Sequence, residues 1–430
     1  MMAETGGICM EWLVAAVSLL SGLFGLGLTL WGGYYLVTGL MSWRKPEDYG
    51  WHPARTRFAI LIAARNEELV IGPLINSLLT QNYPPELYDI WVIPNNCTDN
   101  TARAAAGFGA KVLECTVPVQ SKGEVLRFAY RRLRGREYDA YCVFDADNLV
   151  HPNFLAEMNN AFQSGARVAQ GYRDSKNPYD SVISGSYSIY YWMMDRFHNG
   201  GRAGLGLSAM VNGTGFMVSG QVLESLGGWN TRTISEDLEI TAQCVLAGEK
   251  VCWVPKAITY DEQPLTYAQS VVQRRRWSSG TLQVAENYFG RAEEERKTSR
   301  RGLALTDLEA TLLVPAYQGA AVAGLIVSLL FACLSCRTLG QIPAALAGTL
   351  LANLVLTALG STVAAAVVLT AEGKWDRRIL GGLMFYWLFL LSWVPITLGS
   401  FVKKTTHWEE IRHTRNIAPQ ALVKERVLAP

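Results

Sequence analysis

The sequence has almost no excess of charge of either sign. Its 39 Lys and Arg residues nearly balance its 37 Asp and Glu residues, which leaves a formal net charge of +2 in 430 residues. Proteins that bind nucleic acid usually carry a basic stripe, whereas the basic residues here cluster beside apolar segments. We therefore expect no nucleic-acid partner.

Closely spaced cysteines are also scarce. Of the eight cysteines, only Cys333 and Cys336 lie near each other, and both fall inside an apolar run. Disulfide frameworks and zinc sites need regularly spaced pairs, so we expect reduced, buried thiols and no zinc centre. Reduced thiols fit a domain that faces the cytosol.

Long apolar runs, in contrast, are abundant. Charge is nearly absent from Trp12 to Met41, and about 20 apolar residues suffice to cross a bilayer, which predicts a transmembrane helix within residues 1–45. A cleaved signal peptide is the alternative. It is disfavoured because Glu4 and Glu11 stand where a signal peptide has basic residues, and because the apolar run is too long.

Further apolar stretches, each long enough to span, form a predicted bundle over residues 301–402. They are 312–336, 342–370 and 379–402. One crossing before the catalytic domain and three after it would leave the tail, 403–430, outside, although its Lys and Arg residues mark it as cytoplasmic. We therefore predict that one stretch is re-entrant or interfacial, and favour the last, where Trp393-Val394-Pro395 interrupts the helix.

Within the predicted domain, 46–300, strands and helices alternate from Phe58 to Asp145 in the way that is typical of a doubly wound parallel sheet, and beyond residue 150 the pattern changes to Gly-rich and aromatic segments. Ligands of such sheets bind at the carboxyl ends of the strands. Three predicted strands end there on polar residues: Arg65, Asn95 and Asp145. Because Arg44 and Lys45 precede this domain, the positive-inside rule places it in the cytoplasm.

Asp145 and Asp147 lie where a buried strand ends, one residue apart. Side chains alternate along an extended chain, so both carboxylates project from the same side and can approach one hard cation. Mg²⁺ or Mn²⁺ held in this way leaves positions for phosphate oxygens, which favours a nucleotide or a phosphosugar as substrate. A turn or a helix cap is the ordinary alternative.

Other polar residues have both a functional and a plain structural interpretation. Lys122 opens a predicted helix and either meets a phosphate or lies on the surface, and the surface is favoured on this residue alone. Gly213 and Gly215 precede an apolar strand and either admit a sugar or diphosphate or form a bulge. Glu236 and Asp237 are either functional acids or first-turn helix acids.

Three motifs together resemble those of membrane family 2 glycosyltransferases, which include hyaluronan, chitin, cellulose and poly-N-acetylglucosamine synthases. Asp145-Ala146-Asp147 matches D-x-D, Ser235-Glu236-Asp237 matches (T/S)-E-D, and Gln273-Arg274-Arg275-Arg276-Trp277 matches Q-x-x-R-W. The resemblance covers residues 57 to 290. It implies a GT-A, Rossmann-like nucleotide-sugar transferase domain flanked by transmembrane helices.

The resemblance also implies roles. Asp237 would be the general base, with Glu236 as its competitor, while Asp147 and Asp145 would hold Mg²⁺ or Mn²⁺. Arg275 or Arg276 would neutralise the departing diphosphate, and Trp277 would pack near the acceptor. The residues expected to bind the donor are Ala63, Arg65, Glu67, Asn95, Lys122, Asp145, Gly213, Gly215 and Gln273.

Two of these positions depart from the family pattern. Relatives commonly have Pro at the position of Ala63 and often have Asp at the position of Asn95. A neutral amide can accept a hydrogen bond from a nucleobase but cannot match a carboxylate, so base recognition is expected to be altered.

One carboxylate base suffices for an inverting, in-line displacement, and no second acid is positioned as a nucleophile. We therefore expect transfer from a nucleotide sugar, with UDP as the expected nucleotide, to a growing β-linked polysaccharide at the plasma membrane. The alternative is transfer of one sugar to a membrane lipid, because about four spans are few for a translocating synthase unless an oligomer or a secretion partner completes the pore. A non-catalytic membrane scaffold is the third hypothesis.

Overall fold

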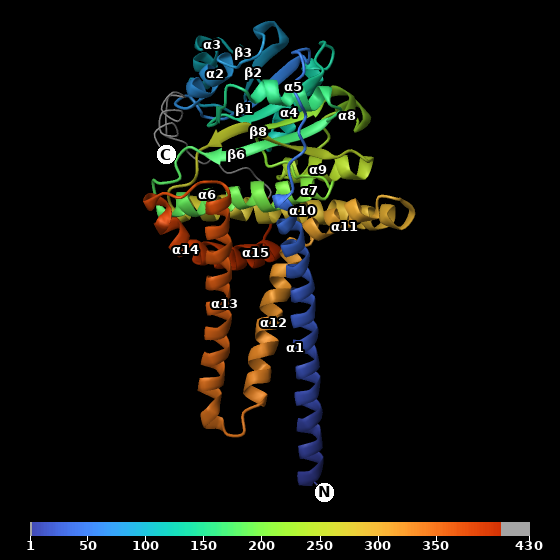
Figure 1. Ribbon diagram of the computed structural model, residues 1–430, viewed down its shortest axis with the longest axis vertical. Helices are drawn as coiled ribbons and strands as arrows, with labels where there is room; N and C mark the ends of the chain where they lie inside the picture. The colour runs from blue at the N-terminus through green and yellow to red at the C-terminus, as the bar shows by residue number, and fades with distance from the viewer. Residues whose placement is uncertain (1, 406–430) are drawn as a thin grey trace.

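The computed structural model describes residues 2–405, so most of the expected basic tail, from residue 406 onward, lies outside the described residues. An α/β domain sits on a layer of crosswise helices, and long helices extend from that layer on the opposite side (Figure 1).

The α/β domain is built on one eight-stranded sheet with the order β3-β2-β1-β4-β7-β6-β8-β5. Its strands are β1 Phe58–Ala64, β2 Tyr88–Pro94, β3 Lys111–Val112, β4 Ala140–Asp145, β5 Leu149–Val150, β6 Val168–Ser175, β7 Phe216–Ser219 and β8 Val251–Asp261. The strands β1 to β4 are parallel, as predicted from the alternating pattern.

The second half of the sheet, which the alternating pattern does not cover, is mixed: β7 runs antiparallel to both β4 and β6. The chain enters β7 from the carboxyl end of β4, where Val143 pairs with Phe216. Gly213 and Gly215 have φ values of 82° and 63°, in the left-handed region that favours glycine, and they turn the chain into the sheet at this point. The complete sheet is therefore mixed, and the Gly-containing segment lies at the same edge as Asp145.

Helices cover both faces of the sheet. The helices of this domain are α2 Ile71–Leu79, α3 Thr101–Gly107, α4 Lys122–Leu133, α5 Phe154–Gln163, α8 Gly220–Ser225 and α9 Glu236–Ala247. Alternate residues of β1 enter two different cores: Leu61 packs with Leu126 of α4, whereas Ile60 packs with Leu74 of α2. Burial on both faces explains why β1 reads as a continuous apolar run.

The crosswise layer lies under the domain (Figure 1). It consists of α6 Val182–Met193, the π-helix η3 Met194–Gly200, α7 Gly201–Gly204, α10 Tyr267–Thr298, α11 Gly302–Leu312, α14 Leu380–Leu391 and α15 Trp393–Val402. The predicted interruption of the last apolar stretch is confirmed, because the helix breaks at Ser392 between α14 and α15.

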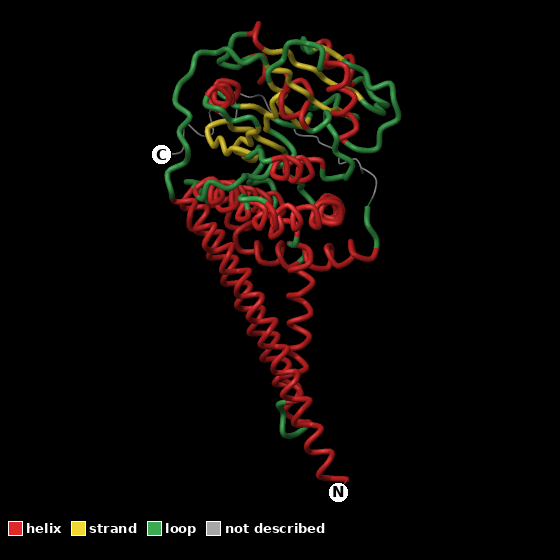
Figure 2. The backbone as a smooth tube through the Cα atoms, turned by 90° about the vertical axis from the view of Figure 1, so that its right-hand side faces the viewer, coloured by secondary structure: helices red, strands yellow, loops and turns green. Residues whose placement is uncertain are grey.

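Among the residues that the structure describes, four segments are long and apolar enough to cross a membrane: 11–43, 314–334, 339–371 and 377–402. Three of them form upright helices, α1 Met2–Leu40, α12 Val314–Leu334 and α13 Ile342–Ala371. The fourth forms α14 and α15 of the crosswise layer (Figures 1 and 2). α1 packs against α12 and α12 against α13, so that α12 lies between the other two (Figure 1).

Candidate active site

A pocket lies where β1, β2 and β4 end. Most of the residues singled out in the sequence line it: Ala63, Arg65, Glu67, Asn95, Lys122, Asp145, Asp147, Gly213, Glu236, Asp237, Gln273, Arg276 and Trp277. The structure thus brings together residues that are up to 214 positions apart in the chain, from Ala63 to Trp277.

Two predicted residues do not lie on the pocket wall. A Cβ atom added to Gly215 would lie 2.8 Å from the side chain of Thr259, so glycine is needed there for strand packing. Its carbonyl oxygen also accepts a hydrogen bond from the backbone N–H of Gly171 (2.9 Å). Arg275 is exposed and points off the helix face that lines the pocket.

Lys122 is the first residue of α4, whose start is fixed by a capping box between Ser121 and Glu124. Its Nζ atom contacts the carboxylate of Asp145, donates to the carbonyl oxygen of Gly213 (2.7 Å) and lies 3.7 Å from Glu236. Burial disfavours the charge, but the nearby carboxylates outweigh it and raise the pKa of Lys122. The surface alternative for this lysine is therefore wrong, since its side chain is only 11% exposed.

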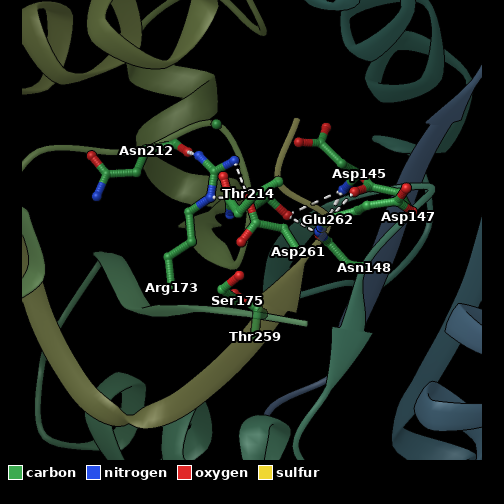
Figure 3. A network of polar contacts seen from close by, with 12 residues as sticks. Asp145, Asp147, Asn148, Arg173, Ser175, Asn212, Thr214, Thr259, Asp261 and Glu262 are labelled. Carbon is green, nitrogen blue, oxygen red and sulfur yellow. Dashed lines mark hydrogen bonds and ion pairs between the residues drawn. The ribbon is translucent and has the colours of Figure 1, made fainter. Parts of the chain in front are cut away.

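Hydrogen bonds to Asn148 and Thr214 fix the end of β4, as Figure 3 shows. The backbone N–H of Asp145 donates to Asn148 Oδ1 (3.0 Å) and to Thr214 Oγ1 (3.1 Å), and the Thr214 hydroxyl donates to Asn148. Asp147 is 5% exposed, and its Oδ2 atom accepts from the backbone N–H of Glu262 (3.0 Å). Both carboxyl groups of the pair are thus held at one pocket edge.

This donor set fits a hard divalent cation, because it offers carboxylate oxygens and no soft ligand. Asp145 and Asp147 both line the pocket, and the Asp145 side chain is 36% exposed to it. Within residues 2–405, no group of three or more His, Cys, Asp and Glu residues is arranged to hold a metal on its own. Two carboxylates would therefore need oxygens from a bound diphosphate to complete the coordination of Mg²⁺ or Mn²⁺.

The two acids at the start of α9, Glu236 and Asp237, both have raised pKa values. Burial raises the pKa of Glu236 to about 7, with Lys122 opposing this shift and Asp237 adding to it. Burial also raises the pKa of Asp237, against the effects of the Leu238 N–H, which donates to its Oδ1 (2.8 Å), and of Lys122 and Arg173. Ser235 makes no capping hydrogen bond, so the structural cap interpretation is not observed.

Residues spaced three and four apart share one face of α10, and Gln273, Arg276 and Trp277 present this face to the pocket. Trp277 stacks on Tyr190 of α6 (6.4 Å between centroids, 20° between planes) and contacts Trp393 of α15. Arg274 is fully buried and donates to the Phe389 carbonyl oxygen (3.0 Å) and to Ser392 Oγ (2.8 Å). The three arginines thus have three different environments.

Several lining residues were missed in the sequence, above all Arg173 of β6 and Asp261 of β8. Arg173 donates twice to Asp261 Oδ2 (2.8 and 2.6 Å) and once to the carbonyl oxygen of Asn212 (2.7 Å), and its guanidinium lies 4.0 Å from the centre of the Tyr191 ring (Figure 3). A signal existed for Asp261, because it ends the apolar run of β8 as Asp145 ends that of β4.

Known proteins resemble this chain over the same region. It is 28% identical over 247 residues to a probable glycosyltransferase, YdaM, of Bacillus subtilis, covering 54% of this chain and 57% of that protein. It is 28% identical over 305 residues to a beta-monoglucosyldiacylglycerol synthase of Nostoc, covering 65% and 63%. The chain therefore spans less than two thirds of the length of these curated relatives.

A solved structure shares the fold at low identity. The mannosyltransferase of Pyrobaculum calidifontis, determined in complex with GDP-Man and Mn²⁺, is 17% identical and covers 90% of this chain and 99% of its own, with a TM-score of 0.56. The α/β domain thus has the GT-A glycosyltransferase fold. Residues 53–280, more than half of the chain, match the family described as "Glycosyltransferase like family 2", and the chain belongs to this family of glycosyltransferases.

Proposed function

We propose that this enzyme transfers a single sugar from a nucleotide sugar to a hydroxyl group of a membrane lipid at the surface of the bilayer. This is the alternative to the polysaccharide synthase that the motifs alone favour. The observation that carries it is the arrangement of the upright helices. α12 lies between α1 and α13, so the three described helices form an open row and enclose no path through a membrane (Figure 1).

The acceptor side of the pocket supports the same function. Gln273, Arg276 and Trp277 line the pocket from α10, a helix of the crosswise layer. In the same layer, α14 exposes an apolar face formed by Leu380, Met384, Phe385, Leu388 and Leu391. A crosswise helix with an exposed apolar face suits the boundary between headgroups and acyl chains. A lipid headgroup there would reach Trp277 without leaving the membrane.

The same arrangement supports a topology with three crossings. If α1, α12 and α13 cross and α14 and α15 lie in the interface, the catalytic domain and residue 403 share one side of the membrane. We place this side in the cytoplasm of a multi-pass plasma-membrane protein, because Arg44 and Lys45 follow α1 directly.

The chemistry follows from the groups around the pocket. Asp237 accepts the proton of the acceptor hydroxyl, whose oxygen bonds to the anomeric carbon while the bond to the nucleoside diphosphate breaks and configuration inverts. Arg276 and Lys122 stabilise the charge of the departing diphosphate. A divalent cation held by Asp145 and Asp147 would supply further charge neutralisation at this group. Asn95 and Arg65 are positioned for the nucleotide end of the donor.

The test is a product analysis. Purified enzyme in lipid nanodiscs is incubated with a panel of labelled nucleotide sugars, UDP-sugars first, with and without diacylglycerol or glycolipid acceptors. A single labelled species that extracts into organic solvent supports lipid transfer. A ladder of water-soluble products would instead identify a polymerase, and unchanged nucleotide sugar with every acceptor would contradict both.

A polysaccharide synthase remains the second candidate, because the Gln273 to Trp277 segment resembles the Q-x-x-R-W motif of enzymes that extend chains. In that case the pore would require helices from further copies or a partner, and activity would depend on that assembly.

A further inference from the structure

The connection between α13 and α14 reaches into the α/β domain. Glu372 and Lys374 lie on this connection, and both side chains are largely buried, 14% and 17% exposed. Burying a charged side chain is costly unless the charge has a partner. The partners of Glu372 and Lys374 therefore hold the end of the hairpin formed by α12 and α13 in one position.

The partners of this connection lie on β6 and on the helix that follows it. Lys374 Nζ donates to Asp174 Oδ2 (2.8 Å), and the Asp174 side chain is 2% exposed. Glu372 accepts from the Tyr172 hydroxyl (2.9 Å) and from Arg196 (3.4 Å). The other oxygen of Asp174 accepts from the indole N–H of Trp192 (2.9 Å).

The residue between these two contacts lines the active site. Side chains alternate along a strand, so Tyr172 and Asp174 face the membrane connection while Arg173 faces the pocket. Arg173 is fixed there by Asp261 and by the carbonyl oxygen of Asn212, and its backbone N–H donates to Asp195 (3.1 Å) in the π-helix η3. Arg173 and Asp237, the proposed base, line the same pocket, and the positive charge of Arg173 lowers the pKa of Asp237.

We propose that Lys374 and Glu372 act as a clamp, in which the cytoplasmic end of the α12–α13 hairpin holds β6 and thereby positions Arg173 in the active site. Lys374 is then a positioning residue for glycosyl transfer, although it does not touch the pocket. Insertion of the hairpin and assembly of the pocket are coupled through three consecutive residues of one strand.

The experiment uses the full chain in nanodiscs. Lys374→Met should lower kcat at least about tenfold and leave the Kd for the donor within about twofold, because Arg173 lines the same pocket as the proposed base. Lys374→Arg, which keeps the charge, should recover most of the rate. Arg377→Met removes an exposed cation three residues along the same connection and should behave like wild type.

Hydrogen–deuterium exchange provides a readout that does not depend on identifying the acceptor. Lys374→Met should speed exchange across β6, Val168–Ser175, and the neighbouring end of β8, whereas Arg377→Met should not. Faster exchange confined to residues 372–376, or an unchanged kcat, would overturn the clamp.

A double-mutant cycle covers the case in which Lys374→Met is poorly folded. Asp174→Asn combined with Lys374→Met should be less damaging than the sum of the two single changes, because each alone leaves a buried charge without its partner. Additive effects on both exchange and rate would show that the contact does not couple the hairpin to the strand.

Discussion

Lys122, the first residue of α4, reaches across the pocket floor to Asp145, the last residue of β4. The two residues lie 23 positions apart in the sequence, at the start of α4 and at the end of β4. It places a fixed positive charge beside the carboxylate that is expected to approach the donor diphosphate.

Replacement of this lysine should impair donor binding. Lys122→Met removes the cation while keeping an apolar stem of similar length, and the Kd for the nucleotide sugar should rise about tenfold or more. Titration calorimetry with the donor alone measures this. Lys111→Met, which breaks an ion pair with Asp89 at the surface, is the matched control and should leave the Kd unchanged.

The proposed general base, Asp237, should be separable from its neighbour Glu236 by two conservative changes. Asp237→Asn keeps the shape and loses the base, so transfer should fall by at least about a hundredfold while donor binding stays near wild type. Glu236→Gln should have the smaller effect on transfer. Loss of transfer in the Glu236 variant alone would move the base by one residue, and normal specific activity of poorly expressed Asp237→Asn would return Asp237 to a structural role.

Glu236 also predicts a pH dependence of stability. Its pKa is raised to about 7 in the folded protein, so its contribution to stability is present at acid pH and is lost as the pH rises through 7. Glu236→Gln stays neutral and should therefore raise the Tm by a few degrees at pH 8. This gain should shrink as the pH falls toward 4.5, and thermal unfolding of both proteins at four pH values measures it. A gain that grows on acidification would contradict the assignment.

The metal prediction concerns the pair at the end of β4. Asp147→Asn should abolish turnover and weaken donor binding, because a neutral amide is a poorer ligand for Mg²⁺ or Mn²⁺. Wild-type activity should likewise be lost in EDTA and restored by Mn²⁺. A variant that retains wild-type activity in EDTA would exclude this role for Asp147.

Arg274 and Arg276 should fail in different ways. Arg274 is fully buried and donates to two groups at the break between α14 and α15, so Arg274→Met should lower stability by about 1–3 kcal/mol. Arg276 lines the pocket, and Arg276→Met should fold normally and lose about a hundredfold in kcat. Size-exclusion profiles and Tm values, measured beside kcat, separate the two outcomes.

The sequence predicts the parts of the site that are encoded locally. Asp145, Asn95 and Arg65 could be placed because each follows a buried strand, and parallel strands end at one edge. Asp261 ends an apolar strand in the same way, but Arg173 lies inside β6 and could not be placed, since it meets Asp261 only through the pairing of β6 with β8. The antiparallel direction of β7 could not be predicted from the sequence either, because periodicity shows which face of a strand is buried but not in which direction the strand runs.

Long-range contacts also decided the environment of single residues. Lys122 looks like a surface lysine at the start of a polar helix, but Asp145, Gly213 and Glu236, all from other elements, enclose it. In the same way, apolar content alone marks residues 377–402 as a fourth span. The buried Arg274, more than 100 residues earlier, holds the break that makes this segment two crosswise helices.

The position of Trp277 on a helix of the crosswise layer has a consequence for how the rate should be measured. The donor arrives by diffusion in water, whereas an acceptor lipid arrives by diffusion within the leaflet. Its effective concentration is then a surface density, set by its mole fraction in the bilayer and not by the total amount of lipid. Diluting the acceptor with inert phosphatidylcholine at constant total acceptor should slow the reaction, and adding more vesicles of the same composition should leave turnover per enzyme unchanged.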